Sequence, residues 1–316
     1  MSTTLGDGKV VIAIDVGGTE TKSALVDEGG NLLSVTRSAS PVSSDGSADA
    51  LIAHLAGLTD SYAREYPSLA PSAIGLSVPG LVDEAAGVGV MSANLGWRNA
   101  PIRRLAVDAL GGPVAFGHDV RAAGLAEHQL GAARGASDAV IITIGTGLSG
   151  AIITNGALAP SGGYAGEFGH SPIDPAGELC SCGARGCVER ISSASAIVSR
   201  YRARAGLAPT STVAPGARDV LALATAGDLA AQAVWSEAVS AIALTLARIT
   251  AFLGPEVIVL GGGLSHAGDA LFVPVREQLR EHLSFHRVPE VVPALLGGDA
   301  GLLGTALAAR TLAEAA

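Results

Sequence analysis

All three cysteines of the chain lie within one short segment, and a histidine precedes them. His170 is followed by Cys180, Cys182 and Cys187 in the order Cys-x-Cys-x4-Cys. Three sulfur atoms and one imidazole nitrogen form a closed tetrahedral donor set, which suits Zn²⁺ and leaves no position for a metal-bound water. The spacing therefore predicts a structural zinc loop over residues 166–189.

Two carboxylates, Glu167 and Glu189, flank these ligands. A loop held by a metal ion would keep both carboxylates in fixed positions and would form a rigid polar pocket from irregular backbone. Three reduced, buried thiols beside an unrelated histidine are the alternative interpretation. A disulfide is less favoured, because an odd number of cysteines leaves one thiol unpaired.

The composition is typical of a well-buried α/β enzyme. The chain has 316 residues, 48% of them hydrophobic and 16% charged, with 42 glycines. This length is sufficient for two domains. Three cysteines in such a chain are consistent with the reducing cytoplasm, and the first residues lack the apolar segment of a signal peptide.

The charge balance disfavours nucleic acids and anionic membranes as partners. The chain has 20 basic and 29 acidic residues, a formal net charge of −9, which repels polyanions. The uncharged stretch 139–166 is interrupted by glycines, which favours two buried strands over a membrane span.

Three glycine-rich turns follow expected strands. Strand 9–15 ends at Asp15 and is followed by Gly17, Gly18 and Thr19, whereas strand 139–144 is followed by Gly145, Thr146 and Gly147. Glycine lets backbone N–H groups approach phosphate closely, and Asp15 would face Mg²⁺ through water. Strand 256–260 leads into Gly261, Gly262 and Gly263, which would either support a flat ring or form an ordinary turn.

Asp119 follows His118 at the end of expected strand 113–116 and precedes expected helix 120–131. The aspartate is either a helix N-cap or a general base. The remaining pattern predicts further strands over 21–27, 32–36 and 73–78 and one that resumes at residue 151. It predicts helices over 48–66, 191–205, 217–226, 229–253 and 300–313.

The order of these motifs resembles the ROK family of bacterial sugar kinases and repressors. The motifs are Asp-Val-Gly-Gly-Thr, the strand end at Asp119, Gly-Thr-Gly, Gly-Glu-Phe-Gly-His with the cysteine block, and Gly-Gly-Gly. The resemblance implies an α/β, two-lobed, actin-like (ribonuclease H-like) sugar-kinase fold with an interlobe cleft. The smaller lobe would be 1–118, rejoined by helix 300–316, and the larger lobe 119–299. The implied assembly is a homodimer or a higher homo-oligomer.

The resemblance also implies ATP-dependent phosphorylation of a hexose, with glucose as the first expectation, and Mg²⁺ as a cofactor beside the structural Zn²⁺. Asp119 would be the catalytic base. The implied zinc ligands are His170, Cys180, Cys182 and Cys187. The implied sugar contacts are Gly80, Asn94, His118, Asp119, Glu167, His170 and Glu189. ATP would bind Asp15, Gly17, Gly18, Thr19, Gly145, Thr146, Gly147, Gly261, Gly262 and Gly263.

The chain departs from the family pattern at three positions. His118 replaces the usual asparagine, Arg121 replaces a small or amide residue, and Glu20 replaces a frequent lysine. An imidazole differs from an amide in reach and hydrogen bonding, so N-acetylmannosamine, fructose and allose are alternative substrates.

Two other functions are compatible with the resemblance. One is a sugar-responsive regulator of the repressor type without its DNA-binding domain, since the first strand is expected at about residue 9. The other is a kinase that uses polyphosphate, which the cysteine block argues against because that branch typically lacks these cysteines.

Overall fold

The computed structural model describes residues 4–159 and 161–315, and the chain divides into two compact units. Unit 1 comprises Met1–Arg134, Leu158–Ala165 and Gly298–Ala316, and unit 2 comprises Gly135–Ala157 and Gly166–Gly297. The sequence-based boundary lay between residues 118 and 119. The structure instead keeps α3 (Asp119–Gln129) in unit 1, because α3 packs against α9 (Ala300–Ala315) of the same unit.

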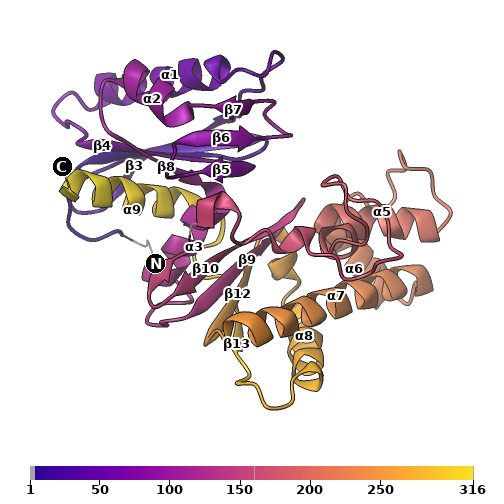
Figure 1. Ribbon diagram of the computed structural model, residues 1–316. Coiled ribbons are helices and arrows are strands. Elements are labelled where there is room, and N and C mark those ends of the chain that lie inside the picture. Colours follow the sequence, from indigo (N-terminus) through magenta and orange to yellow (C-terminus); the bar gives the residue numbers. More distant parts are fainter. Residues whose placement is uncertain (1–3, 160, 316) are drawn as a thin grey trace. The chain divides into compact units, whose positions relative to one another are not determined.

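Unit 1 is built on a five-stranded sheet with the strand order β3-β2-β1-β4-β8 (Figure 1). Strands β1, β2 and β3 pair antiparallel, whereas β1 pairs parallel with β4 and β4 with β8. The strands are β1 (Val11–Val16), β2 (Glu20–Val26), β3 (Leu32–Ala39), β4 (Ala73–Val78) and β8 (Val114–His118).

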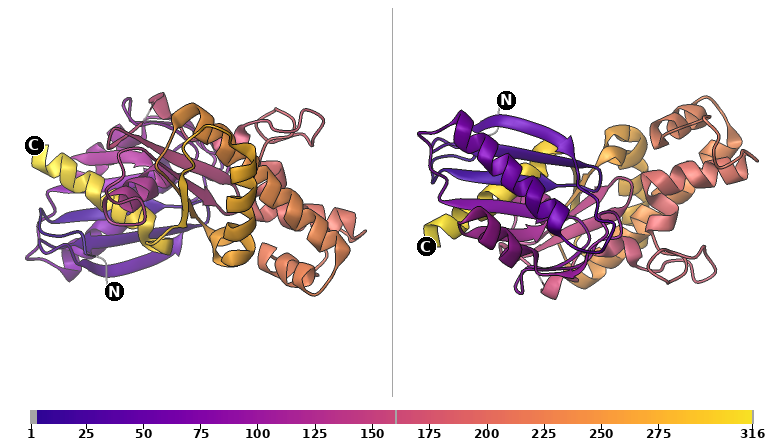
Figure 2. Two further views of the ribbon diagram at one scale, coloured as in Figure 1. Left: turned by 90° about the horizontal axis from the view of Figure 1, so that it is seen from below. Right: turned by 90° about the horizontal axis from the view of Figure 1, so that it is seen from above.

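Helices cover both faces of this sheet, because alternate residues of a strand point to opposite sides. Ile12 and Ile14 pack in one cluster with α1 (Asp49–Glu65) and α2 (Ile102–Leu110), whereas Val11 packs in another with α9. Figure 2 shows the yellow helix α9 in front of the strands from below and the dark helix α1 in front from above. The central strands are therefore buried on both faces.

A small sheet, β5-β6-β7, follows β4 in unit 1. Its strands are β5 (Leu81–Asp83), β6 (Val88–Met91) and β7 (Arg98–Ala100). The turn into β5 requires glycine, because Gly80 has φ +101° and an added Cβ would lie 2.3 Å from the carbonyl oxygen of Met91.

Unit 2 contains a second five-stranded sheet with the order β11-β10-β9-β12-β13 (Figure 1). Its strands are β9 (Ala139–Ile144), β10 (Leu148–Thr154), β11 (Ala157–Leu158), β12 (Val257–Gly261) and β13 (Glu290–Pro293). Its helices are α4 (Glu189–Ser192), α5 (Ala194–Arg204), α6 (Ala217–Thr225), α7 (Leu229–Leu253) and α8 (Asp269–His282). One apolar cluster joins strands β9 and β12 to α5, α6, α7 and α8.

Helix α7 is the one described helix that is long and apolar enough to cross a membrane. Its most apolar window is 56% buried inside the structure, and Ile242 and Leu246 belong to the core of unit 2. A buried core helix of a folded protein meets the same criteria, so this helix is weak evidence for a membrane.

The sequence-based bounds of β4, β9 and α7 are confirmed. The single helix expected over 191–205 is wrong in detail, because Ser193 is extended (φ −68°, ψ 156°) and separates α4 from α5. The Ser193 side chain accepts a hydrogen bond from the N–H of Ala196, so it caps the second helix.

Candidate active site and metal centre

The four predicted metal ligands lie together in unit 2. One donor atom from each of His170, Cys180, Cys182 and Cys187 can be chosen so that all lie within 4.8 Å of one another. The Sγ atoms of Cys182 and Cys187 are 3.6 Å apart, close to the roughly 3.8 Å between two sulfur atoms on one tetrahedral zinc ion. This separation excludes a disulfide between them.

Backbone contacts and glycines shape the loop that carries these ligands. The N–H groups of Ile173 and Asp174 donate to the carbonyl oxygen of Gly186, and the N–H of Gly186 donates to Glu178. Gly186 has φ +64°, and an added Cβ would lie 1.6 Å from the Asp174 carbonyl oxygen. The loop therefore folds back on itself only with glycine at this position.

The surroundings shift the pKa values of two of these thiols in opposite directions. Burial raises the pKa of Cys180, but hydrogen bonds from the Cys182 backbone and the His170 side chain outweigh it and lower this pKa to about 7. Burial and the neighbouring thiols raise the pKa of Cys187 to about 12. A divalent cation would remove the repulsion between adjacent thiolates, so the donor set fits zinc.

The residues before the metal ligands pack tightly on β10. The N–H of Gly150 donates to the Gly166 carbonyl oxygen, and a Cβ on Gly169 would lie 2.1 Å from the carbonyl oxygen of Leu148. Glu167 therefore lies between two glycines held against the strand. His170 presents Nδ1 at 3.6 Å from Sγ of Cys180, which places Nδ1 on the sulfur side of the ring.

Glu189 connects the cysteine loop to the Gly145–Gly147 turn. Its Oε2 accepts a hydrogen bond of 2.9 Å from the N–H of Leu148, and a Cβ on Gly147 would lie 2.7 Å from the same oxygen. At the start of α5, the Ser195 hydroxyl donates to the carbonyl oxygen of Thr146. The structure thus brings one predicted sugar contact against the predicted phosphate turn.

The third glycine turn lies beside the second. Gly262 has φ +79°, and an added Cβ would lie 2.5 Å from the carbonyl oxygen of Ile144, the residue before Gly145. A cavity of about 360 Å³ adjoins Thr146. Its lining residues are Thr146, Ala194, Ser195, Val198, Ser199, Arg202, Pro215, Gly216 and Ala217. No local sequence pattern predicts this cavity, because its walls come from Thr146, from α5 and from the start of α6, which are distant in sequence.

In unit 1, Asp119 is the first residue of α3, at the end of β8. Its Oδ1 accepts a hydrogen bond of 2.7 Å from the N–H of Val120 and lies 3.3 Å from Nε2 of His118. The N-cap position belongs to His118, so the N-cap interpretation of Asp119 is wrong. Burial, and then the charge of Arg121, lower the pKa of His118 to about 3, which keeps the imidazole neutral.

The first glycine turn is also in unit 1, next to Asn94. A Cβ on Gly18 would lie 3.0 Å from Nδ2 of Asn94, so the predicted phosphate turn and one predicted sugar contact are neighbours. Gly17 donates its N–H to the carbonyl oxygen of Glu20. The Glu20 carboxylate accepts a hydrogen bond of 2.8 Å from Arg37, and both side chains are about half exposed.

Asp15 is held at the end of β1 by two packed neighbours. Oδ1 accepts from the Ser77 hydroxyl at 2.7 Å, and a Cβ on Gly301 would lie 2.3 Å from Oδ2. Burial raises the pKa of Asp15, against the lowering effects of Ser77 and Lys22. A nearby cation would favour the charged carboxylate, so Asp15 fits a position that faces Mg²⁺.

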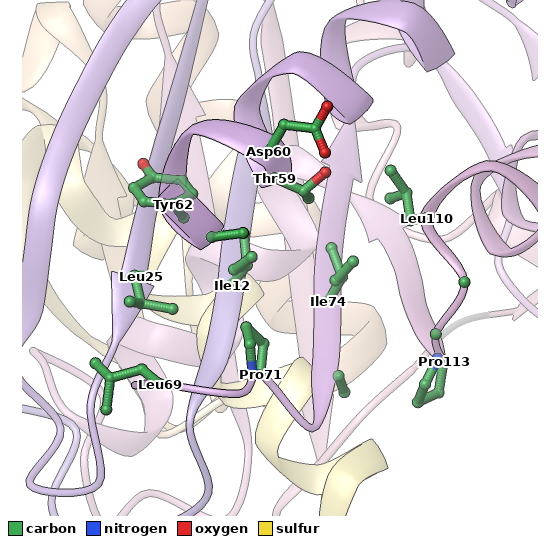
Figure 3. Close-up of a pocket in the computed structure, with 14 residues that line it drawn as sticks. Ile12, Leu25, Thr59, Asp60, Tyr62, Leu69, Pro71, Ile74, Leu110 and Pro113 are labelled. Carbon is green, nitrogen blue, oxygen red and sulfur yellow. The ribbon is translucent and has the colours of Figure 1, made fainter. Parts of the chain in front are cut away.

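A further cavity of about 260 Å³ in unit 1 is separate from these groups (Figure 3). Helix α1 contributes Thr59, Asp60 and Tyr62 to its wall, and apolar side chains such as Leu69 and Ile74 form much of the remainder. None of the predicted site residues is among the described residues that line it.

Comparisons with known proteins show the family to which the whole chain is related. The model of the ROK family matches residues 11–311. A glucokinase of Streptomyces coelicolor is 31% identical over 95% of this chain and 98% of its own length. An N-acetylmannosamine kinase of Yersinia pseudotuberculosis is 33% identical over 95% of this chain and 98% of its own.

Solved structures show the same fold. The ROK hexokinase of Thermus thermophilus has a TM-score of 0.83 and 31% identity, covering 97% of this chain and 100% of that one. A ROK glucokinase of Streptomyces griseus in complex with glucose and AMPPNP has a TM-score of 0.78 and 30% identity, covering 96% and 99%. A ROK family transcriptional regulator has a TM-score of 0.85 and 26% identity, covering 97% and 79%.

These findings define the class as a sugar kinase with the mixed α/β, actin-like fold. The chain belongs to the ROK family. The expected family and fold class are confirmed, whereas the roles of individual site residues stay predictions.

Proposed function

We propose that this protein transfers the γ-phosphoryl group of ATP to a hexose, with glucose as the first substrate and glucose 6-phosphate as the product. The observation that carries the proposal is the likeness, over 96% of the chain, to a glucokinase solved with glucose and AMPPNP. The N-acetylmannosamine kinase at 33% identity supports that sugar as the alternative substrate.

In the proposed mechanism, Asp119 accepts the proton of the sugar hydroxyl as the bond to phosphorus forms. A sugar hydroxyl is a weak nucleophile at neutral pH, so a carboxylate within hydrogen-bond reach is useful. The hydrogen bond from Val120 to Oδ1 restricts the rotation of this carboxylate. The remaining contribution of the protein is alignment of the two substrates and stabilisation of charge.

We assign sugar binding to Gly80, Asn94, His118, Asp119, Glu167, His170 and Glu189. Because Nδ1 of His170 lies on the sulfur side, Nε2 is the ring nitrogen left to donate to a sugar hydroxyl. Zinc bound at Nδ1 would enforce that tautomer. The metal would thus fix a sugar contact without taking part in the reaction.

We assign ATP binding to the three glycine turns. The Gly17–Thr19 and Gly145–Gly147 turns offer backbone N–H groups to phosphate oxygens, and Asp15 would hold Mg²⁺, which neutralises phosphate charge when bound. The cavity beside Thr146 has space for part of a nucleoside at about 360 Å³, and Gly261–Gly263 lies next to this turn.

The proposal is tested by incubating the purified protein with ATP and Mg²⁺ and a panel of hexoses, and by measuring the products by mass spectrometry. We expect a mass increase of one phosphoryl group for glucose. A parallel series with polyphosphate tests the other donor. No phosphorylated product from glucose, N-acetylmannosamine, fructose or allose, beside an active control kinase, would contradict the proposal.

A sugar-responsive regulator is the second candidate, favoured by the TM-score of 0.85 to a ROK family transcriptional regulator. Binding of a sugar without any phosphorylated product would support it, and specific retention of DNA at low salt would contradict the kinase proposal. We also propose a cytoplasmic homodimer or higher homo-oligomer. Light scattering of the purified protein tests the assembly, and a mass of one chain would contradict it.

A further inference from the structure

Arg121 is a buried charge that the proposed mechanism does not use. Its side chain is 1% exposed, within unit 1 and two residues after Asp119. Burying a guanidinium is costly unless its charge is paired and its N–H groups are hydrogen-bonded. The contacts that satisfy Arg121 therefore indicate what this residue holds in place.

The Arg121 guanidinium joins two other parts of unit 1 to the start of α3. Its Nε donates to Oε1 of Glu84 at 2.8 Å. Its two terminal nitrogens donate to the carbonyl oxygens of Val82 and Gly163, each at 3.1 Å. Gly163 has φ +89°, and an added Cβ would lie 1.9 Å from the Val82 carbonyl oxygen, so the three segments meet closely around one side chain.

Glu84 extends this contact to the backbone immediately before Asp119. The same Oε1 that pairs with Arg121 accepts a hydrogen bond of 3.0 Å from the backbone N–H of His118. A Cβ on Gly117 would lie 3.2 Å from this oxygen, so glycine leaves space for the carboxylate to approach the chain. One carboxylate oxygen thus fixes the residue before Asp119 and the residue two positions after it.

The side chain of His118 contributes a third constraint. Nε2 lies 3.3 Å from Oδ1 of Asp119, whereas Nδ1 is buried and has no hydrogen-bond partner among the described residues. The neutral ring therefore carries its proton best on Nε2, where it can donate to the carboxylate. Glu84 and Arg121 thus restrain the backbone on either side of Asp119, and His118 restrains its carboxylate.

We propose that Glu84 and Arg121 are positioning residues for Asp119, holding the β8–α3 junction so that its carboxylate stays oriented for proton transfer. The inference rests on the proposed role of Asp119 as base. A displaced base loses rate at the chemical step, while ATP binding at the glycine turns does not require this pair. The predicted signature is a lower kcat with an unchanged KM for ATP.

The test compares Glu84→Gln, Arg121→Met and the double variant with the wild type in steady-state kinetics. Glu84→Gln removes the charge that pairs with Arg121 but keeps an oxygen that can accept hydrogen bonds. Arg121→Met leaves the Glu84 carboxylate without its cation, and the double variant removes both charges. We expect kcat of the double variant to fall by about 10- to 100-fold and KM for ATP to stay within about 2-fold. A kcat within about 2-fold of the wild type in a folded double variant would overturn the inference.

Arg103→Gln is the matched control. Arg103 donates to the backbone carbonyl oxygens of Glu84 and Ala85. It therefore supports the turn that follows β5 and carries Glu84, and neither of these hydrogen bonds goes to residues 117–121. Its kcat is expected to stay near that of the wild type. An equal loss of kcat in Arg103→Gln and the double variant would show a general effect of the turn and would also overturn the assignment.

Two further measurements keep the result interpretable. If the double variant does not fold, Arg121→Lys replaces it, because lysine keeps the charge but not the fork of donors; the same fall in kcat is expected. A wild-type protein without activity on any hexose contradicts the proposed function itself. An active wild type with an inactive Asp119→Asn and a fully active double variant contradicts the positioning role alone.

Discussion

His118 illustrates how burial changes the chemistry of a single residue. With a side chain that is 6% exposed and a pKa lowered to about 3 by burial and Arg121, it stays neutral at physiological pH. The family pattern has asparagine at this position, and its amide can donate and accept hydrogen bonds at the same time. The His118 imidazole instead has one donor nitrogen, which is directed at Asp119. Histidine at this position therefore changes the environment of the Asp119 carboxylate.

We predict that His118 makes the protein sensitive to mild acid. Between the folded pKa of about 3 and the ordinary value of about 6.5, the unfolded chain binds a proton that the folded chain does not, so stability rises with pH. Acidification from about pH 7 to about pH 5 should cost about 2 kcal/mol through this residue. Urea unfolding at both pH values measures the loss.

His118→Asn should lose less unfolding free energy than the wild type over the same pH change. His282→Gln is a suitable control, because His282 is exposed near the end of α8. Equal acid sensitivity in the wild type and in His118→Asn would show that His118 is not neutral in the folded protein.

Asp119→Asn tests the proposed base directly. The amide keeps the size of the side chain and an oxygen that can accept from Val120, but it cannot take up a proton. We expect kcat to fall by about 10²- to 10⁴-fold with little change in thermal stability. Circular dichroism verifies the fold, and an unchanged kcat would remove Asp119 as base.

At the scale of elements, the start of α4 is the link between the cysteine loop and the Gly145–Gly147 turn. Val188 donates its N–H to Ser171 and Ala194 donates to Gly145, while Glu189 accepts from Leu148. The short helix and the residues that flank it thus make backbone and side-chain contacts to both segments. Disturbing these contacts should alter the turn as well as the cysteine loop.

We therefore predict that Glu189→Ala weakens binding of a non-hydrolysable ATP analogue by about 3- to 10-fold, as expected for one lost charge-assisted hydrogen bond. Calorimetry without sugar isolates this effect from sugar binding. Glu178→Ala is the control, because Glu178 pairs with Arg190 on an exposed part of the same loop. An unchanged affinity in Glu189→Ala would restrict Glu189 to the sugar.

The elements most faithfully predicted from sequence were those with one uninterrupted local signal. Strands β4 and β9 are buried apolar runs, and α7 begins at the Asp228 cap and ends at Gly254 in the left-handed region. Helix α8 was missed because it contains Pro274, which normally argues against a helix interior. Strand β13 was missed because it has only four residues and is defined by its pairing with β12, which its own sequence does not indicate.

At the scale of the whole molecule, the parts of the site with a local sequence signal were predicted, and the parts that meet only through the fold were not. The metal ligands share one short segment, so their spacing was sufficient to group them. Glu84, Arg121 and Gly163 meet only through the fold, and no local pattern relates them. Arg121 was therefore visible in the sequence as a departure from the family, but its partner was not.

The account as a whole depends on an ion that holds residues 166–189 in one arrangement, so that Glu167, His170 and Glu189 keep their positions. Without an ion, Cys180, whose pKa is lowered, and Cys187, whose pKa is raised, would have to stay close together with only Cys180 tending to ionise. Chelation should therefore loosen this segment and lower the thermal stability of unit 2, because bound metal stabilises the folded state.

The most direct measurement is the metal content of protein purified without chelator, by elemental analysis, for the wild type and for Cys182→Ser. Cys182 is the exposed ligand of the set, so its replacement disturbs the core least. We predict about one zinc ion per wild-type chain and a large loss in the variant, as expected for a four-ligand structural site. A wild-type protein that folds and contains no transition metal would contradict the account.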